Sequence, residues 1–402
     1  MRTVPIKKVK ILFAGDFCPR GRTEQEIVSG CSKKILSGIL PVLEDKDLSI
    51  VNMEAALTNA DTPILKDSGP NIKVDPACAG FLPEARFDVA ALANNHACDF
   101  GPAALMETIR RIKKQGARVV GAGKNLAAAT APLYLKKNGV KIAVLNFAEN
   151  EFGMAEADRA GFSPLDPLSN VENIRVAARK VGRAGIVIVI IHGGNEHNPV
   201  PSPRMVKTYR AFIDVGASAV IAAHPHCPQG YEFWNGKPIV YSMGNFLFDW
   251  SGTDYKSFWW IGYMVKIVFS PGEGGKAGKL EIIPYTFAPD GCRIRLLEGK
   301  KKEKFMKYIK AISGIIKNSS ESKLFWDAWC AMKGPVFINN CLNGVKWPLK
   351  GKKQLKQAMK MRNIFVCEAH NEVMNNFLRM VEKGRVRKVE KYIPKIRKLQ
   401  KT

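Results

Sequence analysis

The sequence predicts an α/β fold followed by a basic, mainly α-helical C-terminal region. From residue 9 to about residue 250, short apolar runs alternate with segments in which apolar residues recur at helical spacing. This alternation is typical of βαβ units, whose strands form a largely parallel sheet covered on both faces. After about residue 297 the helical spacing continues, glycine and proline become sparse, and lysines occupy the outer positions. We therefore expect two domains, residues 1–297 and residues 298–402.

Six short apolar runs are expected to be strands. They are Val9–Ala14, Leu48–Val51, Val89–Leu92, Ile142–Phe147, Ile186–Ile191 and Ala219–Ala222. Between them, Pro102–Gln115 and Met205–Val215 have the apolar spacing of helices. Three later runs predict further strands, which would form a second and more antiparallel layer. These are Pro238–Ser242, Phe258–Phe269 and Leu280–Phe287.

The composition is that of an ordinary folded protein. The 402 residues are 46% hydrophobic and 24% charged, which excludes a disordered chain, a collagen-like repeat and a coiled-coil rod. The nine cysteines are scattered without a CxxC pair, so a reducing compartment fits them better than a disulfide framework or a zinc ribbon. The N-terminus has no apolar stretch of signal-peptide length, and the longest apolar run, Ala184–Ile191, is far shorter than a membrane span. These features predict a cytoplasmic protein.

Positive charge is concentrated near the C-terminus. The chain has 62 basic and 36 acidic residues, and residues 301–402 hold 25 of the basic and 7 of the acidic ones. Such asymmetry is typical of a protein with a polyanionic partner, although a solvated basic surface is the simpler alternative. We consider an acidic polymer, a phosphorylated envelope precursor, and peripheral contact with the anionic inner face of a membrane. Nucleic acid is not expected, because no RRM, KH, zinc-finger or helix-turn-helix signature is present and the aromatic segment Phe325–Trp329 fits packing against the main domain.

Polar residues follow five of the expected strands at their carboxyl ends. In an α/β sheet this edge is where ligands collect, and four of the six histidines lie there. Taken alone, Asp16 could cap a helix and Asn94-Asn95 could form a turn, but their joint occurrence with the histidines favours a site. The residues at the five strand ends are Asp16, Glu54, Asn94, Asn95, His96, His192, His224 and His226.

These side chains suit divalent metal ions. Imidazole, carboxylate and amide groups bind metals such as Mn, Fe or Zn, and the donors are more numerous than one ion needs. Two ions about 3.5–4 Å apart can share a bridging carboxylate and lower the pKa of a bridging water, which becomes the nucleophile. A histidine beside the metals can then protonate or stabilise the leaving group.

On these residues, the segment from about residue 9 to about residue 250 resembles the poly-γ-glutamate capsule-synthesis (CapA) family, a branch of the calcineurin-like metallophosphoesterase superfamily. The motifs occur in the family's order and spacing over roughly 60% of the chain. They are Gly15-Asp16, Asn52 and Glu54 followed by Leu57-Thr58, the segment from Asn94 to Gly101, the segment from His192 to Glu196, His224-Pro225-His226, and Tyr241 to Phe246 with Asp249.

The resemblance implies a four-layer αββα sandwich with a dinuclear metal centre at the strand ends. Asp16 and His226 would bind one divalent ion, Asn95, His192 and His224 would bind the other, and Glu54 would bridge the two. His96 would be the acid or the transition-state stabiliser. Around these groups, Asp99, Glu196 and Asn245 would orient the ligands or shape the loops.

Three positions depart from the pattern of the superfamily. Cys18 stands where many members have the histidine of a D-x-H motif, and we interpret it as a buried structural cysteine rather than a thiolate ligand. Glu54 takes the place of an aspartate. Gly193 takes the place of an aromatic residue that often follows the histidine in this family.

The resulting hypothesis is a metal-dependent hydrolase that cleaves a phosphoester or amide bond through a metal-activated water. The resemblance links it to capsule or exopolymer biosynthesis of the poly-γ-glutamate type. One alternative is a non-catalytic accessory protein that binds an acidic envelope polymer or its synthase. A further alternative is a nucleotide or nucleic-acid phosphoesterase.

Overall fold

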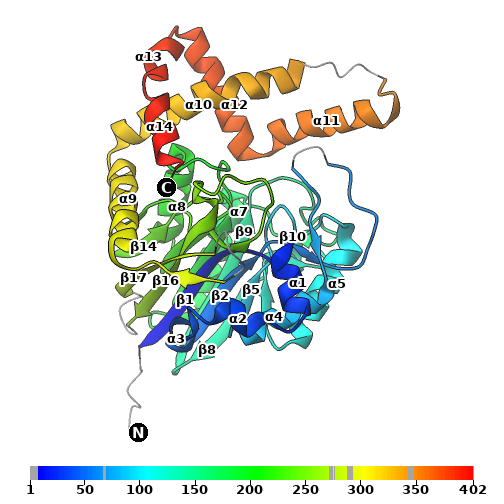
Figure 1. Ribbon diagram of the computed structural model, residues 1–402, viewed down its shortest axis with the longest axis vertical. Coiled ribbons are helices and arrows are strands. Elements are labelled where there is room, and N and C mark those ends of the chain that lie inside the picture. Colours follow the sequence, from blue (N-terminus) through cyan, green and yellow to red (C-terminus); the bar gives the residue numbers. More distant parts are fainter. Residues whose placement is uncertain are drawn as a thin grey trace.

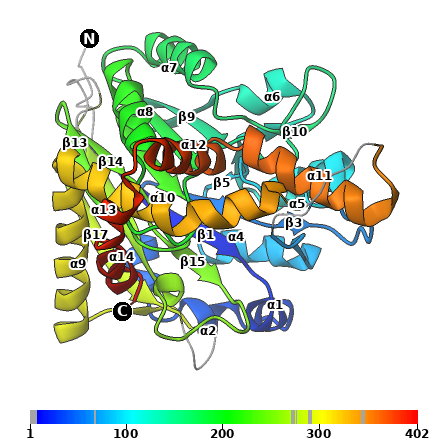
Figure 2. The same ribbon diagram turned by 90° about the horizontal axis from the view of Figure 1, so that it is seen from above.

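The computed structural model describes residues 8–66, 69–270, 275, 277–287, 293–342 and 348–401. Two β-sheets stack face to face, and helices cover the outer face of each sheet, which is the αββα arrangement that the resemblance implied (Figures 1 and 2). The helices from α9 (Gly299–Lys317) to α14 (Ile393–Leu399) follow the sheets in sequence and lie along one side and over one end of them. The fold is therefore α/β with a helical C-terminal region.

The first sheet combines a parallel and an antiparallel part. Strand β1 (Val9–Cys18) lies at its centre, parallel to β2 on one side and antiparallel to β16 on the other. A further strand, β15 (Asn245–Phe248), runs parallel to the end of β1. The order along the sheet is β18 (Arg295–Leu296), β17 (Ala277–Thr286), β16 (Ile261–Phe269), β1, β2 (Leu48–Met53), β5 (Val89–Ala91) and β6 (Arg118–Val120).

The second sheet has a parallel centre with one antiparallel strand at each edge. Its order is β13 (Tyr231–Trp234), β14 (Lys237–Val240), β12 (Ala219–Ala223), β11 (Ile186–His192), β9 (Val140–Ala148) and β8 (Leu133–Lys137). Two small strand pairs lie outside the main sheets. They are β3 (Ala56–Leu57) with β4 (Lys73–Val74), and β7 (Ala122–Gly123) with β10 (Gly161–Phe162).

All six predicted strands are present, but they are divided between the two sheets. The prediction that the three later runs form a separate layer is wrong. Strands β16 and β17 extend the first sheet beside β1, and β14 joins the second sheet beside β12. Most of β16 is buried, which requires a position inside a sheet with both faces covered rather than a solvent-facing layer.

The main core lies between the two sheets. Apolar side chains such as Ile11 and Phe13 of β1 meet Val144 of β9 and Ile188 of β11 in one buried cluster. Helices on the outside of the first sheet bury a second cluster with it. These helices are α1 (Arg22–Val28), α2 (Ser32–Leu36), α3 (Leu40–Glu44), α4 (Phe81–Glu84) and α5 (Gly101–Lys114).

The helices outside the second sheet begin with clear local signals. Both α7 (Pro167–Val181) and α8 (Pro203–Asp214) have a proline at their start, and the side chains of Asp166 and Ser202 accept hydrogen bonds from backbone N–H groups of the first turn. A proline loses no helical hydrogen bond at this position, and the capping oxygen satisfies an otherwise unpaired N–H. The short helix α6 (Leu126–Thr130) lies near the β7–β10 pair.

The C-terminal helices share their core with the second sheet. Ile312 of α9, Trp329 of α10 and Val373 of α12 belong to the same buried cluster as Phe212 of α8. This confirms the predicted packing of the Phe325–Trp329 segment, whereas the division into two domains stays a prediction. Between α9 and α14 lie α10 (Ser319–Leu342), α11 (Gly351–Val366), α12 (Glu368–Glu382) and α13 (Val386–Glu390). Across the described residues, every helix is too short or too polar to cross a bilayer.

Candidate metal centre

The predicted ligands come together at the carboxyl ends of the strands of both sheets. Asp16 lies near the end of β1, Glu54 follows β2, Asn95 follows β5, and His192 ends β11, while His224 and His226 follow β12. All six side chains are buried, with exposed fractions of 8% or less. The face-to-face stacking of the sheets brings these separate strand ends to one place.

The ligand atoms form two groups that share Glu54. In one group, atoms of Glu54, His224 and His226 lie within 4.8 Å of one another, and in the other, atoms of Asp16, Glu54 and His192 do so. Each group offers the carboxylate and imidazole atoms that a divalent metal ion needs. The predicted bridging position of Glu54 is consistent with its membership of both groups.

Glu54 is a buried carboxylate without a hydrogen-bond donor. Neither of its oxygens has a hydrogen-bond partner within the described structure, and one of them lies 3.5 Å from His192 Nε2 and 3.8 Å from His226 Nε2. Burial, together with the nearby charge of Asp16, raises the pKa of Glu54 well above its ordinary value. An isolated buried carboxylate is costly, so this residue fits a position that a cation fills.

Asn95 and two histidines also converge. The Oδ1 atom of Asn95 lies 3.0 Å from His192 Nε2, and the same nitrogen lies 3.0 Å from His224 Nδ1. Burial lowers the pKa of His192 well below its ordinary value and lowers that of His224 to about 4. Both imidazoles are therefore neutral near pH 7, which is the form that binds metal ions. How the ligands divide between two ions stays a prediction.

The backbone of His224-Pro225-His226 is strained. The φ angles of His224 and His226 are 103° and 53°, in a region that residues with a side chain seldom adopt. The backbone N–H of His224 donates to Asp16 Oδ2 over 3.1 Å. Strain of this kind persists where surrounding contacts determine the conformation, and it is concentrated at functional sites.

Two asparagines hold the ligands in place. Asn52 donates to Asp16 Oδ1 over 2.7 Å, and the same amide nitrogen lies 3.1 Å from His192 Nδ1. Asn245 Oδ1 lies 2.8 Å from His226 Nδ1, while its amide group donates to the carbonyl of Trp259. From the sequence, Asn245 was expected to orient the ligands or shape the loops, which stays a prediction, and Asn52 was noted only as part of a motif.

His96 lies beside the ligands in a small polar cluster. Its Nδ1 atom lies 2.7 Å from Asp99 Oδ2, and Asp99 also accepts hydrogen bonds from Lys66 Nζ and from the N–H of Ile72. Burial lowers the pKa of His96 and outweighs the opposing effect of Asp99. The contact with Asp99 fixes the orientation of the ring. Lys66, whose side chain is only 2% exposed, was missed because no local pattern marks a lysine in a loop as buried.

Cys18 and Gly193 differ from the superfamily pattern for visible reasons. Cys18 is part of the apolar core outside the first sheet, and burial raises the pKa of its thiol well above the ordinary value. It is absent from the two ligand groups that the described residues form. At Gly193, an added Cβ atom would lie 2.7 Å from Cγ of Glu149, so the side chain of Glu149 occupies the space that a larger residue would need.

The loops around the site are tied to the C-terminal helices. Glu149, after β9, pairs with Arg204 of α8, which also pairs with Glu372 of α12. Asn195 donates to the carbonyl of Ala369 over 2.9 Å. Figure 2 shows α10, α11 and α12 crossing over the strand ends, and we call these three helices the helical cover.

A cavity of about 450 Å³ lies between the ligands and the helical cover. Asn95, His96 and Glu196 line it from the side of the sheets. Burial opposes ionisation of Glu196, but the imidazoles of His226 and His224 outweigh it and lower the pKa of Glu196 to about 2. These three predicted site residues therefore face a space that a small molecule or the end of a chain could enter.

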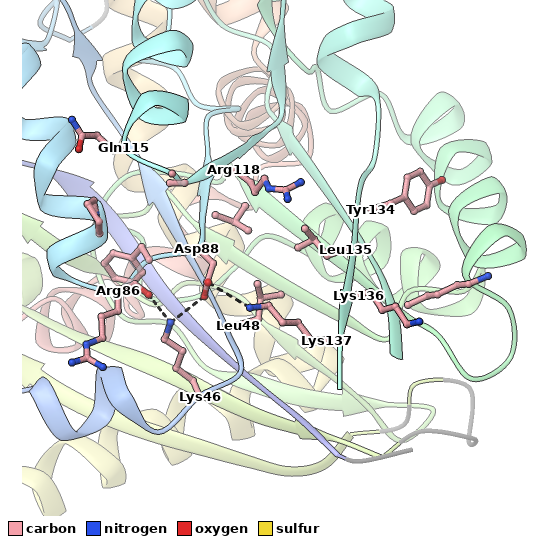
Figure 3. A pocket seen from close by; sticks show the side chains of 16 residues that line it. Lys46, Leu48, Arg86, Asp88, Gln115, Arg118, Tyr134, Leu135, Lys136 and Lys137 are labelled. Atoms are coloured by element: carbon pink, nitrogen blue, oxygen red, sulfur yellow. Dashed lines mark hydrogen bonds and ion pairs between the residues drawn. The ribbon is translucent and has the colours of Figure 1, made fainter. Parts of the chain in front are cut away.

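A larger groove of about 810 Å³ lies where several strands begin (Figure 3). It is basic, and its one carboxylate, Asp88, is paired with Lys46 and Lys137. None of the predicted site residues lines it, whereas Asn95, His96 and Glu196 line the smaller cavity. The chemistry expected from the sequence is thus found at the smaller cavity.

Comparison with known proteins gives a match to the same part of the chain. A family model described as "Bacterial capsule synthesis protein PGA_cap" matches residues 10–250. The PGA biosynthesis protein CapA of Bacillus subtilis (strain 168) is 31% identical over 246 residues, which are 60% of this chain and 64% of that protein. The capsule biosynthesis protein CapA of Bacillus anthracis is 30% identical over 255 residues, 61% of this chain and 62% of that protein.

A third relative is named "Probable polyglutamine synthesis accessory protein", from Mycobacterium tuberculosis (strain ATCC 25618 / H37Rv). It is 31% identical over 225 residues, 53% of this chain and 59% of that protein. The chain thus spans less than two thirds of the length of these relatives. Since the family model matches more than half of the chain and includes all six predicted ligands, the chain belongs to the bacterial capsule synthesis protein PGA_cap family.

Proposed function

We propose that this chain is a metal-dependent hydrolase that cleaves a phosphoester or amide bond in a capsule-type polymer or its precursor. The observation that carries the proposal is the buried carboxylate of Glu54, which has no hydrogen-bond donor and belongs to both groups of ligand atoms. The names of the relatives support a connection with capsule polymer synthesis.

The residues present fit two divalent ions such as Mn, Fe or Zn. Asp16, Glu54, Asn95, His192, His224 and His226 would hold them. Bound there, such ions would polarise the scissile group and lower the pKa of a water molecule. Asn52 and Asn245 keep the carboxylate and imidazole ligands oriented, which is the function of the residues that surround most metal sites.

His96 is the candidate acid of the reaction. Because its Nδ1 atom faces Asp99, Nε2 is the ring nitrogen that remains to donate a proton or a hydrogen bond to a leaving group. Asp99 would stabilise the protonated ring, and Lys66 would hold Asp99 in place. His96 lines the cavity, so a substrate there would be within reach of its ring.

The accessory role is the second candidate. It is favoured by the name of the mycobacterial relative and by the basic C-terminal region. In that case the chain would bind an acidic polymer or its synthase without cleaving a bond. Peripheral contact with an anionic membrane and a nucleotide substrate stay predictions from the sequence.

The test is the metal content of the purified protein, measured by elemental mass spectrometry for wild type and Glu54→Gln. Glu172→Gln, which removes an exposed carboxylate on α7, is the matched control. We expect about two equivalents of metal in wild type and in the control, and a clear loss in Glu54→Gln. In chelator, Glu54→Gln should melt no lower than wild type, because Glu54 accepts no hydrogen bond that the substitution would remove.

Absence of metal after reconstitution with Mn, Fe and Zn would overturn the hydrolase proposal. If metal binds, phosphoester and γ-glutamyl amide substrates are then compared. Metal-dependent cleavage of either would identify the scissile bond, and cleavage of neither would favour the accessory role.

A further inference from the structure

The helical cover encloses the candidate metal centre and lies outside the residues that the family model matches. Its hydrogen bonds go to the loops that carry the site: Asn150 donates to Glu368 of α12, and Asn195 donates to the carbonyl of Ala369. At the far end of the chain, Gln400 donates to the carbonyl of His197 over 2.8 Å. The cover is therefore fixed over the strand ends by specific polar contacts.

The cavity has two chemically different walls. The wall formed by the sheets carries the candidate ligand Asn95 and the candidate acid His96, together with Glu151 and Glu196. The wall formed by the cover carries Trp329 and Lys333 of α10, Lys360 and Asn363 of α11, and His370 of α12. The lining of the cavity thus combines cations and an aromatic ring from the cover with Asn95 and His96 from the sheets.

Among the described residues, the two cover lysines that line the cavity have no carboxylate partner. Neither Lys333 nor Lys360 forms an ion pair there, and Lys333 Nζ lies 5.1 Å from the ring centroid of Trp329. On the opposite wall, burial and the charge of Glu196 raise the pKa of Glu151 to about 8, so its carboxyl group is mostly protonated near pH 7. Glu196 is the other carboxyl group of that wall. The positive charges of Lys333 and Lys360 are thus available to bind a ligand.

We propose that Lys333 and Lys360 bind an anionic group of the substrate that is separate from the group bound at the metal centre. This inference rests on the proposed function, because it names the substrate class of the same site. A substrate held at both walls needs two or more anionic groups along its length. A γ-linked glutamate oligomer, which carries one carboxylate per residue, has this chemistry, whereas a single phosphate or carboxylate would occupy only one wall.

The test is calorimetric titration with a γ-linked glutamate trimer. Wild type is compared with Lys333→Met/Lys360→Met and with the matched control Lys353→Met/Lys356→Met, which removes two exposed lysines of α11 outside the cavity. The first variant should bind the trimer about tenfold or more weakly, because it removes the charge-assisted hydrogen bonds that both ammonium groups would donate. The control should bind within about twofold of wild type, since exposed and screened charges contribute little.

Two further measurements keep the result specific. Lys333→Arg/Lys360→Arg should restore most of the affinity, and a trimer with amidated α-carboxyl groups should bind all variants equally weakly. Equal loss in both methionine variants, no loss in the first, or no binding to wild type would overturn the proposal. Metal content, measured on the same samples, tests the proposed function separately: lysine-dependent binding without metal would retain this cavity as a polyanion site and reject the hydrolase.

Discussion

Glu54 follows strand β2 and Asp88 precedes strand β5, and their surroundings shift the pKa values of the two carboxyl groups in opposite directions. Glu54 has no hydrogen-bond donor, and burial raises its pKa. Partial burial also acts to raise the pKa of Asp88, but the ammonium groups of Lys46 and Lys137 and the N–H of Ser49 outweigh it and lower the pKa. Glu54 is therefore suited to bind a cation, whereas Asp88 is already paired with the ammonium groups of Lys46 and Lys137.

Asp88→Asn should therefore destabilise the protein in a pH-dependent way. The folded-state pKa of Asp88 lies below the unfolded value of 3.8, so its stabilising effect is present above that pH and is lost as pH falls through the folded-state pKa. Near pH 7 we expect the free energy of unfolding to fall by about 1 kcal/mol, since the carboxylate is partly exposed. Urea unfolding in chelator at pH 7, 5 and 3 measures this effect.

The exposed Asp158 supplies the control for that series. Asp158→Asn should change the unfolding free energy little at any pH. A difference between wild type and Asp88→Asn that stays constant down to pH 3 would show that charge pairing does not explain the effect.

At the scale of elements, Arg204 connects three parts of the fold. It lies on α8, pairs with Glu149 after β9 and with Glu372 of α12, and has a side chain that is 26% exposed. Burial acts to lower the pKa of Arg204, but the two carboxylates outweigh it and raise that pKa. Burial acts to raise the pKa of Glu149, but Arg204 outweighs it and lowers that pKa. Glu149 in turn accepts the N–H of Gly194, beside the ligand His192. This network joins the helical cover to the loop of the metal centre.

Removing only the cation from this network should be strongly destabilising. Arg204→Met leaves the buried carboxylate of Glu149 and the partly buried carboxylate of Glu372 without their partner, and we expect a loss of about 3 kcal/mol in the free energy of unfolding. The triple variant Glu149→Gln/Arg204→Met/Glu372→Gln should recover much of that loss, because no charge is then left unpaired. Chemical denaturation of both variants gives the comparison, and a triple variant no more stable than Arg204→Met would contradict the explanation.

At the scale of the whole molecule, the C-terminal helices and the second sheet form one apolar cluster. Side chains from α9, α10 and α12 cover Phe212 and other apolar residues outside that sheet. A fragment that ends at residue 297 would expose this surface, so we expect it to bind a hydrophobic dye, to self-associate on gel filtration and to melt at a lower temperature than the full chain.

The control for truncation is Lys353→Met/Lys356→Met in the full chain, which removes charge but keeps the packing. It should behave like wild type in all three measurements. A fragment that stays monomeric with an unchanged melting temperature would instead support the predicted division into two independent domains.

Much of the fold and of the candidate site could be predicted from local patterns. Apolar runs placed β1, β2, β5, β9, β11 and β12 in the sequence, and the polar residues after them included all six candidate ligands, because strand periodicity and residue order are local properties. The resemblance added the αββα layering. Lys66 and Arg204 could not be recognised in this way, since their burial depends on segments far away in the chain.

The sequence by itself determined which polar residues follow the strands and that residues 298–402 are basic with helical spacing. Only the tertiary structure decided which sheet each strand joins, the strained backbone that directs His224 and His226, and the position of the helices over the cavity. The physical reason is that these features depend on contacts between distant segments, such as β1 with β16 or Asn195 with Ala369. Packing, rather than local propensity, selects among such contacts.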